Sequence, residues 1–160
     1  WGTPNYDFWC CHGSVIQAQT IYNELTYYKD QSGYVVAQYL PGEFKDTFDG
    51  SQIQIKQRLI DTDNSIVYVH TLDTPAHRPN DWKIELSIKS DQPKEFSLKL
   101  RLPWWIAGKA QIFLNNQLHA EIDKPSSYVE LKRAWKDDTI RLVMPKKITV
   151  FPKLLSISSD

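Results

Sequence analysis

The chain has 160 residues, and its 19 basic and 19 acidic side chains give a formal net charge of zero. Because no overall field would attract nucleic acid or an anionic membrane surface, we expect neither as a partner. No stretch approaches the roughly 20 apolar residues of a membrane-spanning helix. The length fits one well-buried domain with the remnant of a second.

The predicted elements begin with a short helix and continue as strands. Residues 12–24 are weakly helical, with Ser14 as the N-cap. From residue 26 onward apolar and polar residues alternate, which is typical of half-buried strands. Residues 30–33 predict a hairpin turn in which Gly33 supplies a positive φ. The predicted strands are 26–29, 34–39, 52–59, 65–70, 82–89, 96–102, 110–114, 118–122, 128–131 and 139–144.

This succession of short strands indicates the fold class. About ten strands with turns between them and little helix are typical of an antiparallel β-sandwich. Residues 72–81 are a predicted loop, since Pro75 and Pro79 fall within them. We therefore predict a mainly β chain, an antiparallel β-sandwich preceded by a short helical remnant.

Two adjacent cysteines, Cys10 and Cys11, are the only cysteines of the chain. Adjacent thiolates can present two soft ligands to one metal ion, or one nucleophile and one ligand. Three interpretations stay open: buried small apolar residues, a strained vicinal disulfide, or ligands and nucleophile of an active site. His12 follows directly and is a candidate third ligand or proton shuttle, against a role as a turn residue held by backbone groups.

The other polar candidates lack a spacing specific for catalysis. Three histidines fall on separate strands and a proline-rich loop, without metal-ligand spacing. Four aspartates lie in predicted loops, where two could form a glycosidase pair, although turn chemistry explains them. These residues are His70, His77, His119, Asp61, Asp63, Asp73 and Asp81. Trp104 and Trp105 follow Pro103 and form either a sugar-stacking platform or a hydrophobic plug at a strand end.

Five segments resemble glycoside hydrolase family 127, the cysteine-dependent β-L-arabinofuranosidase family. Residues 8–14 (Phe-Trp-Cys-Cys-His-Gly-Ser) resemble its double-cysteine block, and residues 34–40 resemble the strand that follows. Residues 98–105 are similar to its "LRIPxW" strand. Residues 113–116 are similar to its "xxNG" hairpin, and 133–140 to its "xxWxxGDxI" segment. The order and spacing hold over nearly the whole chain.

The resemblance implies an (α/α)6 barrel with the active site, followed by β-sandwich domains. Residues 1–25 would be the end of the barrel, and 26–160 the sandwich, which need not include its last strand or strands. Family members are retaining glycosidases with a cysteine thiolate as nucleophile. By resemblance Cys10 is that nucleophile, and Cys10 and Cys11 are both ligands of Zn²⁺. The other zinc ligands, in a Glu-x-Cys motif, and the acid/base glutamate would lie before Trp1.

We therefore expect a piece of a glycosidase that acts on arabinofuranoside-containing glycans. Alone it should be inactive and hold no zinc, because two of four ligands are too few. The sequence departs from the family pattern at Asn116 and Asp137, which stand where the family has Gly. Both are predicted turn positions, where Asn and Asp tolerate positive φ.

Two alternatives belong to other classes of protein. One is a stand-alone carbohydrate-binding or protein-interaction sandwich, which would display coplanar exposed aromatics such as Trp104 and Trp105. The other is a small metal-binding module built on Cys10, Cys11 and His12. Exposed sandwich or helix surfaces offer a route to oligomers. The first residues match neither a signal peptide nor an initiator methionine, so targeting cannot be read from them. The location is unknown, and a cytoplasmic one is expected over a secreted one.

Overall fold

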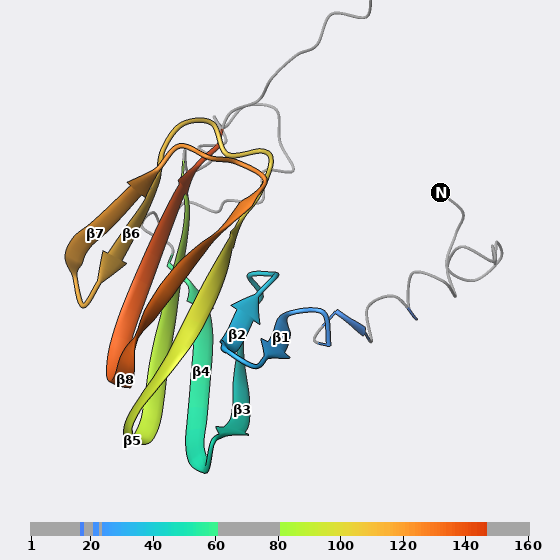
Figure 1. Ribbon diagram of the computed structural model, residues 1–160. Coiled ribbons are helices and arrows are strands. Elements are labelled where there is room, and N and C mark those ends of the chain that lie inside the picture. Colours follow the sequence, from blue (N-terminus) through green and yellow to red (C-terminus); the bar gives the residue numbers. More distant parts are fainter. Residues whose placement is uncertain (1–16, 18–20, 23, 61–80, 147–160) are drawn as a thin grey trace, which may run out of the picture.

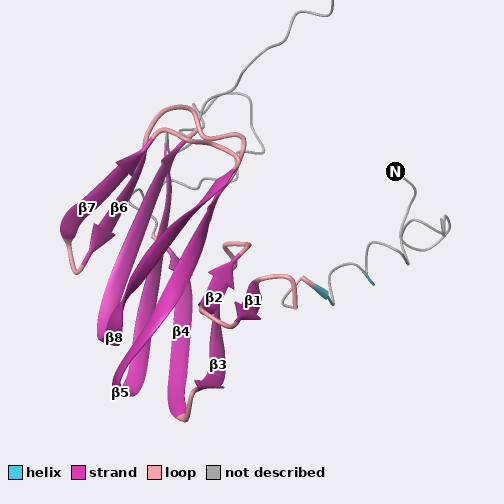
Figure 2. Cartoon of the chain, in the orientation of Figure 1, coloured by secondary structure: helices cyan, strands magenta, loops and turns pink. Residues whose placement is uncertain are grey.

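The computed structural model describes residues 17, 21–22, 24–60 and 81–146. These residues form eight strands (Figures 1 and 2). The strands are β1 (Tyr27–Asp30), β2 (Gly33–Val36), β3 (Gly42–Phe48), β4 (Ser51–Leu59), β5 (Asp81–Leu102), β6 (Ala110–Leu114), β7 (Gln117–Ile122) and β8 (Ser127–Pro145). The prediction of a mainly β chain is confirmed.

The helical remnant lacks support, because the described residues form no helical element. Most of the predicted helix at 12–24 lies outside the described residues, as does the predicted strand at 65–70. Before β1, the N–H of Leu25 donates to the carbonyls of Ile21 (3.2 Å) and Tyr22 (3.3 Å), which makes a single turn. Within the described ranges, no helix is both long and apolar enough to cross a membrane.

Two long strands bend and so take part in both layers of the sandwich. β5 pairs antiparallel with β8 over nearly its full length, with a register shift between Lys89 and Lys94. Figure 1 shows each of them running down, turning at the lower end and returning. The sequence predicted four separate strands here, at 82–89, 96–102, 128–131 and 139–144. The prediction of four separate strands was wrong, because residues 82–89 and 96–102 both belong to β5, and residues 128–131 and 139–144 both belong to β8.

The bends divide the strands into two layers. The larger layer contains β3, β4, the first half of β5, the second half of β8, β6 and β7. The smaller layer contains β1, β2 and the remaining halves of β5 and β8. Every pairing is antiparallel except that of β2 with β5, which is parallel. The predicted sandwich is therefore antiparallel apart from one strand.

The core lies between the two layers. In the longer strands apolar residues at alternate positions point inward. In the first half of β5, for example, Ile84, Leu86 and Ile88 are each no more than 1% exposed. Tyr34 of β2 joins the layers, because its ring lies 5.4 Å from that of Phe44 on β3. Burying such side chains on both faces supplies most of the stability of a sandwich.

The parallel pairing of β2 and β5 depends on Gly33. Its φ of +149° suits glycine, and a Cβ there would lie 2.1 Å from the backbone oxygen of Ser97. The Ser97 N–H donates to the carbonyl of Ser32 at 2.8 Å, which fixes this close approach. The predicted positive φ at Gly33 is confirmed.

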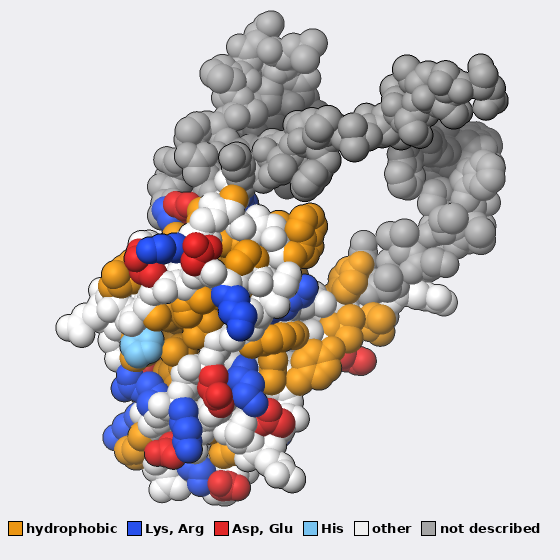
Figure 3. Space-filling model, turned by 45° about the horizontal axis from the view of Figure 1, so that its top comes forward, with side chains coloured by type: hydrophobic (Ala, Val, Ile, Leu, Met, Phe, Trp, Pro, Cys, Tyr) orange, Lys and Arg blue, Asp and Glu red, His pale blue; other side chains and the backbone are white. Residues whose placement is uncertain are grey.

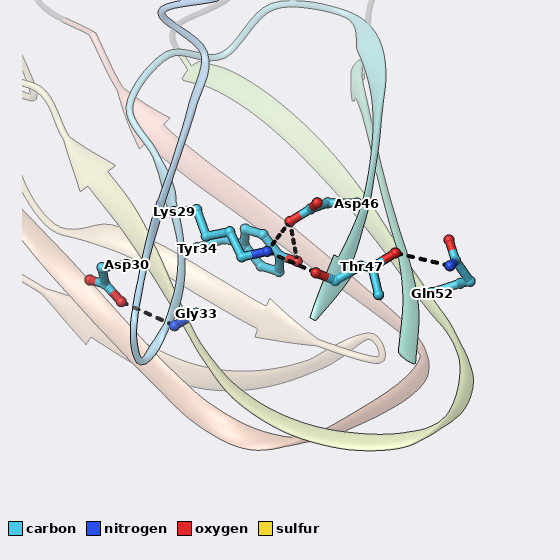
Figure 4. A network of polar contacts seen from close by, with 7 residues as sticks. All are labelled: Lys29, Asp30, Gly33, Tyr34, Asp46, Thr47 and Gln52. Carbon is cyan, nitrogen blue, oxygen red and sulfur yellow. Dashed lines mark hydrogen bonds and ion pairs between the residues drawn. The ribbon is translucent and has the colours of Figure 1, made fainter. Parts of the chain in front are cut away.

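Asp30 holds the turn that presents Gly33 (Figure 4). Its Oδ1 accepts the N–H groups of Ser32 (2.7 Å) and Gly33 (3.0 Å), and its Oδ2 accepts Lys99 Nζ at 2.7 Å. Lys99, followed by the Ser32 hydroxyl and N–H, lowers the pKa of Asp30 well below its ordinary value. The Asp30 side chain is therefore ionised at neutral pH, which is the form that these hydrogen bonds require.

Replacing Gly33 should separate the two strands. We expect Gly33→Ala to lower the free energy of unfolding by about 3 kcal/mol or more, because the methyl group meets backbone that cannot move aside. Gly42→Ala is the matched control. A Cβ there would meet only the Leu40 oxygen at 3.9 Å, so its stability should change by less than about 0.5 kcal/mol. Urea unfolding of both variants tests this, and equal losses would contradict it.

Candidate functional site

The predicted catalytic and metal-binding residues lie outside the described part of the chain. This holds for Cys10, Cys11 and His12. Five of the other candidates also lie outside it: Asp61, Asp63, His70, Asp73 and His77. Over residues 24–60 and 81–146, no three side chains of His, Cys, Asp or Glu gather in a way that could hold a metal ion. The roles of the cysteines thus remain predictions.

The two remaining candidates lie on different strands. His119 is exposed on β7, at one edge of the larger layer. Asp81 begins β5 and lies 3.9 Å from Lys83 Nζ. The described structure does not bring them together, so they form no acid/base pair with each other.

Trp104 and Trp105 occupy different environments. Trp105 is half-buried and stacks on Trp82, with 5.3 Å between ring centroids and 25° between planes. Trp82 in turn contacts the buried ring of Tyr39 edge-on at 6.4 Å. Trp104 points outward and is 72% exposed. Trp105 therefore closes the end of the core, and the pair does not make a coplanar exposed platform.

Figure 3 shows hydrophobic side chains exposed on the visible face. The exposed large hydrophobic residues include Ile21, Tyr22 and Tyr28, each close to half exposed. Charged side chains of both signs are interspersed over the rest of the visible face.

A polar network joins the two layers at one edge (Figure 4). Lys29 of β1 donates from Nζ to Asp46 Oδ2 (2.6 Å) and to the carbonyl of Thr47 (2.8 Å), both on β3. The hydroxyl of Tyr34 donates to the same Asp46 oxygen at 3.0 Å. Gln52 extends the network by donating to the Thr47 hydroxyl at 2.9 Å. It fastens the β1–β2 hairpin to β3.

The charges in this network are balanced. Burial alone would raise the pKa of Asp46, but Lys29, the Thr47 N–H and the Tyr34 hydroxyl together lower it below its ordinary value. Burial, with the neighbouring carboxylate, raises the pKa of Tyr34. At neutral pH Asp46 is therefore ionised and Tyr34 is neutral. These charge states suit a structural clip, our name for the contacts of Lys29, Tyr34 and Asp46 that join the layers. Tyr34 would be a poor general acid, because its raised pKa means that it releases its proton reluctantly.

A second polar network forms where the "xxNG" and "xxWxxGDxI" segments meet. Asp138, 7% exposed, accepts Asn115 Nδ2 at 2.8 Å, Arg133 Nη2 at 3.2 Å and the Lys136 N–H at 3.2 Å. The Asn115 side-chain oxygen accepts the N–H of Thr139 at 2.8 Å. These contacts tie the β6–β7 turn to the bend of β8. The sequence resemblance identified these residues, but only the structure shows that they contact one another.

The two departures from the family pattern have different outcomes. Asn115 and Asn116 have φ values of 49° and 67°, which suit the two-residue turn between β6 and β7. The prediction for Asn116 is confirmed. The prediction for Asp137 was wrong, because Asp137 is not among the described residues with positive φ and continues β8 as a strand.

Two tyrosines at the edge make a matched test of the first network. The Tyr27 hydroxyl is buried and forms no hydrogen bond of good geometry among the described residues, although the Gln57 side chain is close enough to influence it. The Tyr34 hydroxyl, by contrast, donates to Asp46. Tyr34→Phe should lower the free energy of unfolding by about 1.5–3 kcal/mol, because a charged acceptor loses one of its two side-chain donors and keeps only the other, Lys29. Tyr27→Phe should leave the free energy of unfolding unchanged or raise it slightly at neutral pH. Urea unfolding of both variants measures these changes.

The same pair predicts a change at alkaline pH. Burial raises the pKa of Tyr27 from its ordinary 10.0 to about 12, with a partial offset from Gln57. The folded chain thus keeps a proton that the unfolded chain releases, so stability is full below the ordinary pKa and falls as the pH rises towards 12. Tyr27→Phe should flatten this fall. An unchanged alkaline slope, or a neutral-pH loss equal to that of Tyr34→Phe, would count against this account.

Asp138 and its neighbour Asp137 test the second network. Asp138→Ala leaves Asn115, Arg133 and a backbone N–H without their acceptor, and should lower the free energy of unfolding by about 2–4 kcal/mol. Asp137→Ala removes the same charge from an exposed position, and should change it by less than about 0.5 kcal/mol. Thermal or urea unfolding measures both, and equal effects would show that the network carries no stability.

Comparison with known proteins places this architecture. A family model described as the middle domain of GH127 β-L-arabinofuranosidases matches residues 48–146. A search of curated proteins gave no match. The solved structures similar to this chain include a GH127 β-L-arabinofuranosidase from Geobacillus stearothermophilus. Its TM-score is 0.65 and its identity 21%, over 89% of this chain and 20% of that one.

Two further structures agree. One, described as a glycoside hydrolase, has a TM-score of 0.65 and 21% identity, over 89% of this chain and 21% of that one. The other, described as a GH127 β-arabinofuranosidase, has a TM-score of 0.52 and 22% identity, over 77% and 19%. The chain thus spans about a fifth of the length of these structures, whose likeness establishes the fold. Because the family model covers more than half of the chain, the chain belongs to the GH127 middle-domain family of β-L-arabinofuranosidases.

Proposed function

We propose that this chain is part of a longer retaining glycosidase that cleaves β-L-arabinofuranosides. In this proposal residues 1–25 complete a catalytic barrel and residues 26–160 form the sandwich that follows it. The observation that carries it is the family match over residues 48–146, in a chain whose Cys10 and Cys11 precede the sandwich. A middle domain by definition has further domains on both sides, and the similar structures are about four times as long as this chain.

Cys10 is the proposed nucleophile. Its thiolate would form a bond to the anomeric carbon while the bond from that carbon to the leaving oxygen breaks. The leaving oxygen would take a proton from the acid/base glutamate expected before Trp1. Water would then displace the sulfur, after giving a proton to the same glutamate, so that the configuration is retained.

The two cysteines fit zinc in kind but not in number. Thiolates are preferred zinc ligands, and a protein site needs at least three ligands. The described residues add no cluster that could complete the set. When bound, zinc would keep the thiolates deprotonated at neutral pH. The remaining ligands are proposed to come from the Glu-x-Cys motif, so this chain alone should hold no zinc.

The described sandwich supports a structural role in that enzyme. Asp30, Asp46 and Tyr34, whose pKa values are all shifted, are engaged in the turn of Asp30 and in the contacts of Lys29, Tyr34 and Asp46. Tyr39, whose pKa burial raises, is buried and donates to the carbonyl of Arg101 at 2.7 Å. The pair of aromatics that a stand-alone carbohydrate-binding module would display is broken up by the burial of Trp105. The glycosidase therefore accounts for the chain better than a stand-alone module does.

The test compares this chain with the longer protein that contains it. The 160-residue chain should not hydrolyse an aryl β-L-arabinofuranoside, and the longer protein should. In the longer protein, Cys10→Ala should abolish turnover, by at least about 10³-fold for loss of a nucleophile. Cys11→Ala should lower the zinc content measured by mass spectrometry. Turnover by the short chain, or full activity of Cys10→Ala, would overturn the proposal.

A further inference from the structure

The outer face of the larger layer carries a shallow groove across β3, β4 and β5. Two hollows of about 300 and 310 Å³ lie side by side there and share Gln54 and Lys89. They are lined by Glu43, Lys45, Gln52, Ile53, Gln54, Lys56, Ser87, Lys89, Ser90 and Asp91. Nearly all of these are polar, so the groove is suited to a ligand rich in hydroxyl and charged groups rather than to an apolar one.

Strand register arranges the lining in two adjacent rows. Lys45, Gln54 and Lys89 are opposite one another on β3, β4 and β5. Glu43, Lys56 and Ser87 form the next row. Side chains at such neighbouring positions lie within reach of a single bound molecule. The groove is thus a property of the sheet itself and needs no loop to form it.

The charges of the groove are only partly paired. Lys45 binds Glu43 at 2.6 Å. That contact, then a hydrogen bond from Gln54 and the weaker influence of Lys56, lowers the pKa of Glu43 below its ordinary value. Across the described ranges Lys56 and Lys89 make no ion pair, although they are diagonal neighbours on adjacent strands. Two like charges so placed repel each other unless an anion lies between them.

We propose that this groove binds a carbohydrate chain that carries carboxylates. Lys56 and Lys89 hold the carboxylate, and Gln54 and Ser87 bind neighbouring hydroxyls. The carbohydrate class rests on the proposed glycosidase function, and the carboxylate rests on the two lysines. The site lies on the side of the sandwich that faces away from β1 and β2. It would hold an acidic region of the polymer while hydrolysis takes place elsewhere.

The experiment measures binding to the 160-residue chain by isothermal titration calorimetry. The probe is an oligosaccharide of (1→4)-linked hexuronic acid, and its fully methyl-esterified form is the uncharged counterpart. The acidic form should bind and the ester should bind at least about tenfold more weakly, since a charge-assisted contact is worth about 1.5–3 kcal/mol. Added salt should weaken binding of the acid and hardly affect the ester.

Matched variants locate the site. Lys56→Ala with Lys89→Ala should weaken binding of the acid by about tenfold or more. Lys124→Ala with Lys132→Ala removes the same charge outside the groove and should leave the affinity within about twofold. Equal losses in both double variants would mean general attraction between charges and would overturn the proposal. So would equal binding of acid and ester, or no binding of either.

These outcomes are independent of the test of the glycosidase. None of the variants alters Cys10 or Cys11, and binding is measured without turnover. If the acid does not bind but Cys10→Ala abolishes hydrolysis in the longer protein, the groove proposal fails and the glycosidase stands. If the acid binds and Cys10→Ala remains active, the reverse holds. Urea unfolding of each variant confirms that a lost affinity is not a lost fold.

Discussion

The shared bend of β5 and β8 is the constraint on which the rest of the sandwich depends. Because each strand contributes to both layers, the layers cannot slide relative to each other without breaking this pairing. The residues between Lys89 and Lys94 of β5 are opposed by a single residue of β8. A fully buried indole braces the bend from inside, since Trp135 Nε1 donates to the carbonyl of Phe96 at 2.9 Å. A paired donor lets an aromatic of that size be buried without a polar penalty.

The bend also explains where sequence reasoning succeeded and where it did not. Alternation of apolar and polar residues predicted strands on both sides of each bend, because the inward face is set by burial. Asp137 was predicted to lie in a turn between two strands. An interruption in the alternating pattern can become either a turn between two strands or a bend within one strand. The outcome depends on which strand pairs with it, and the local sequence does not specify that partner. The parallel β2–β5 pair was missed for the same reason, although Gly33 was recognised as a glycine-dependent position.

For the candidate site, too, the sequence revealed the family but not the contacts between distant residues. The resemblance identified the family through short segments, and the family model supports it. It could not reveal that Asn115 and Asp138, 23 residues apart, form a hydrogen bond. Nor could the sequence predict that Lys29 and Asp46 form the ion pair between the layers. Such contacts depend on which strands become neighbours, and so they follow from topology rather than from spacing.

The polar residues of the sandwich thus divide into those the fold needs and those it does not. The carboxylates of Asp30, Asp46 and Asp138 accept hydrogen bonds that hold a turn, join the two layers and fix the bend of β8, respectively. The fold itself therefore explains why carboxylates are found at these positions. Lys56 and Lys89 make no ion pair within the described residues, although Lys56 lies opposite Glu43 and helps to lower its pKa, and two like charges at diagonal positions repel each other. Where a surface keeps an unfavourable pair on a regular sheet, a ligand of opposite charge supplies the simplest physical reason. Specificity in this domain is therefore to be sought on the outer face of the larger layer, where side chains are free of the packing that fixes the core.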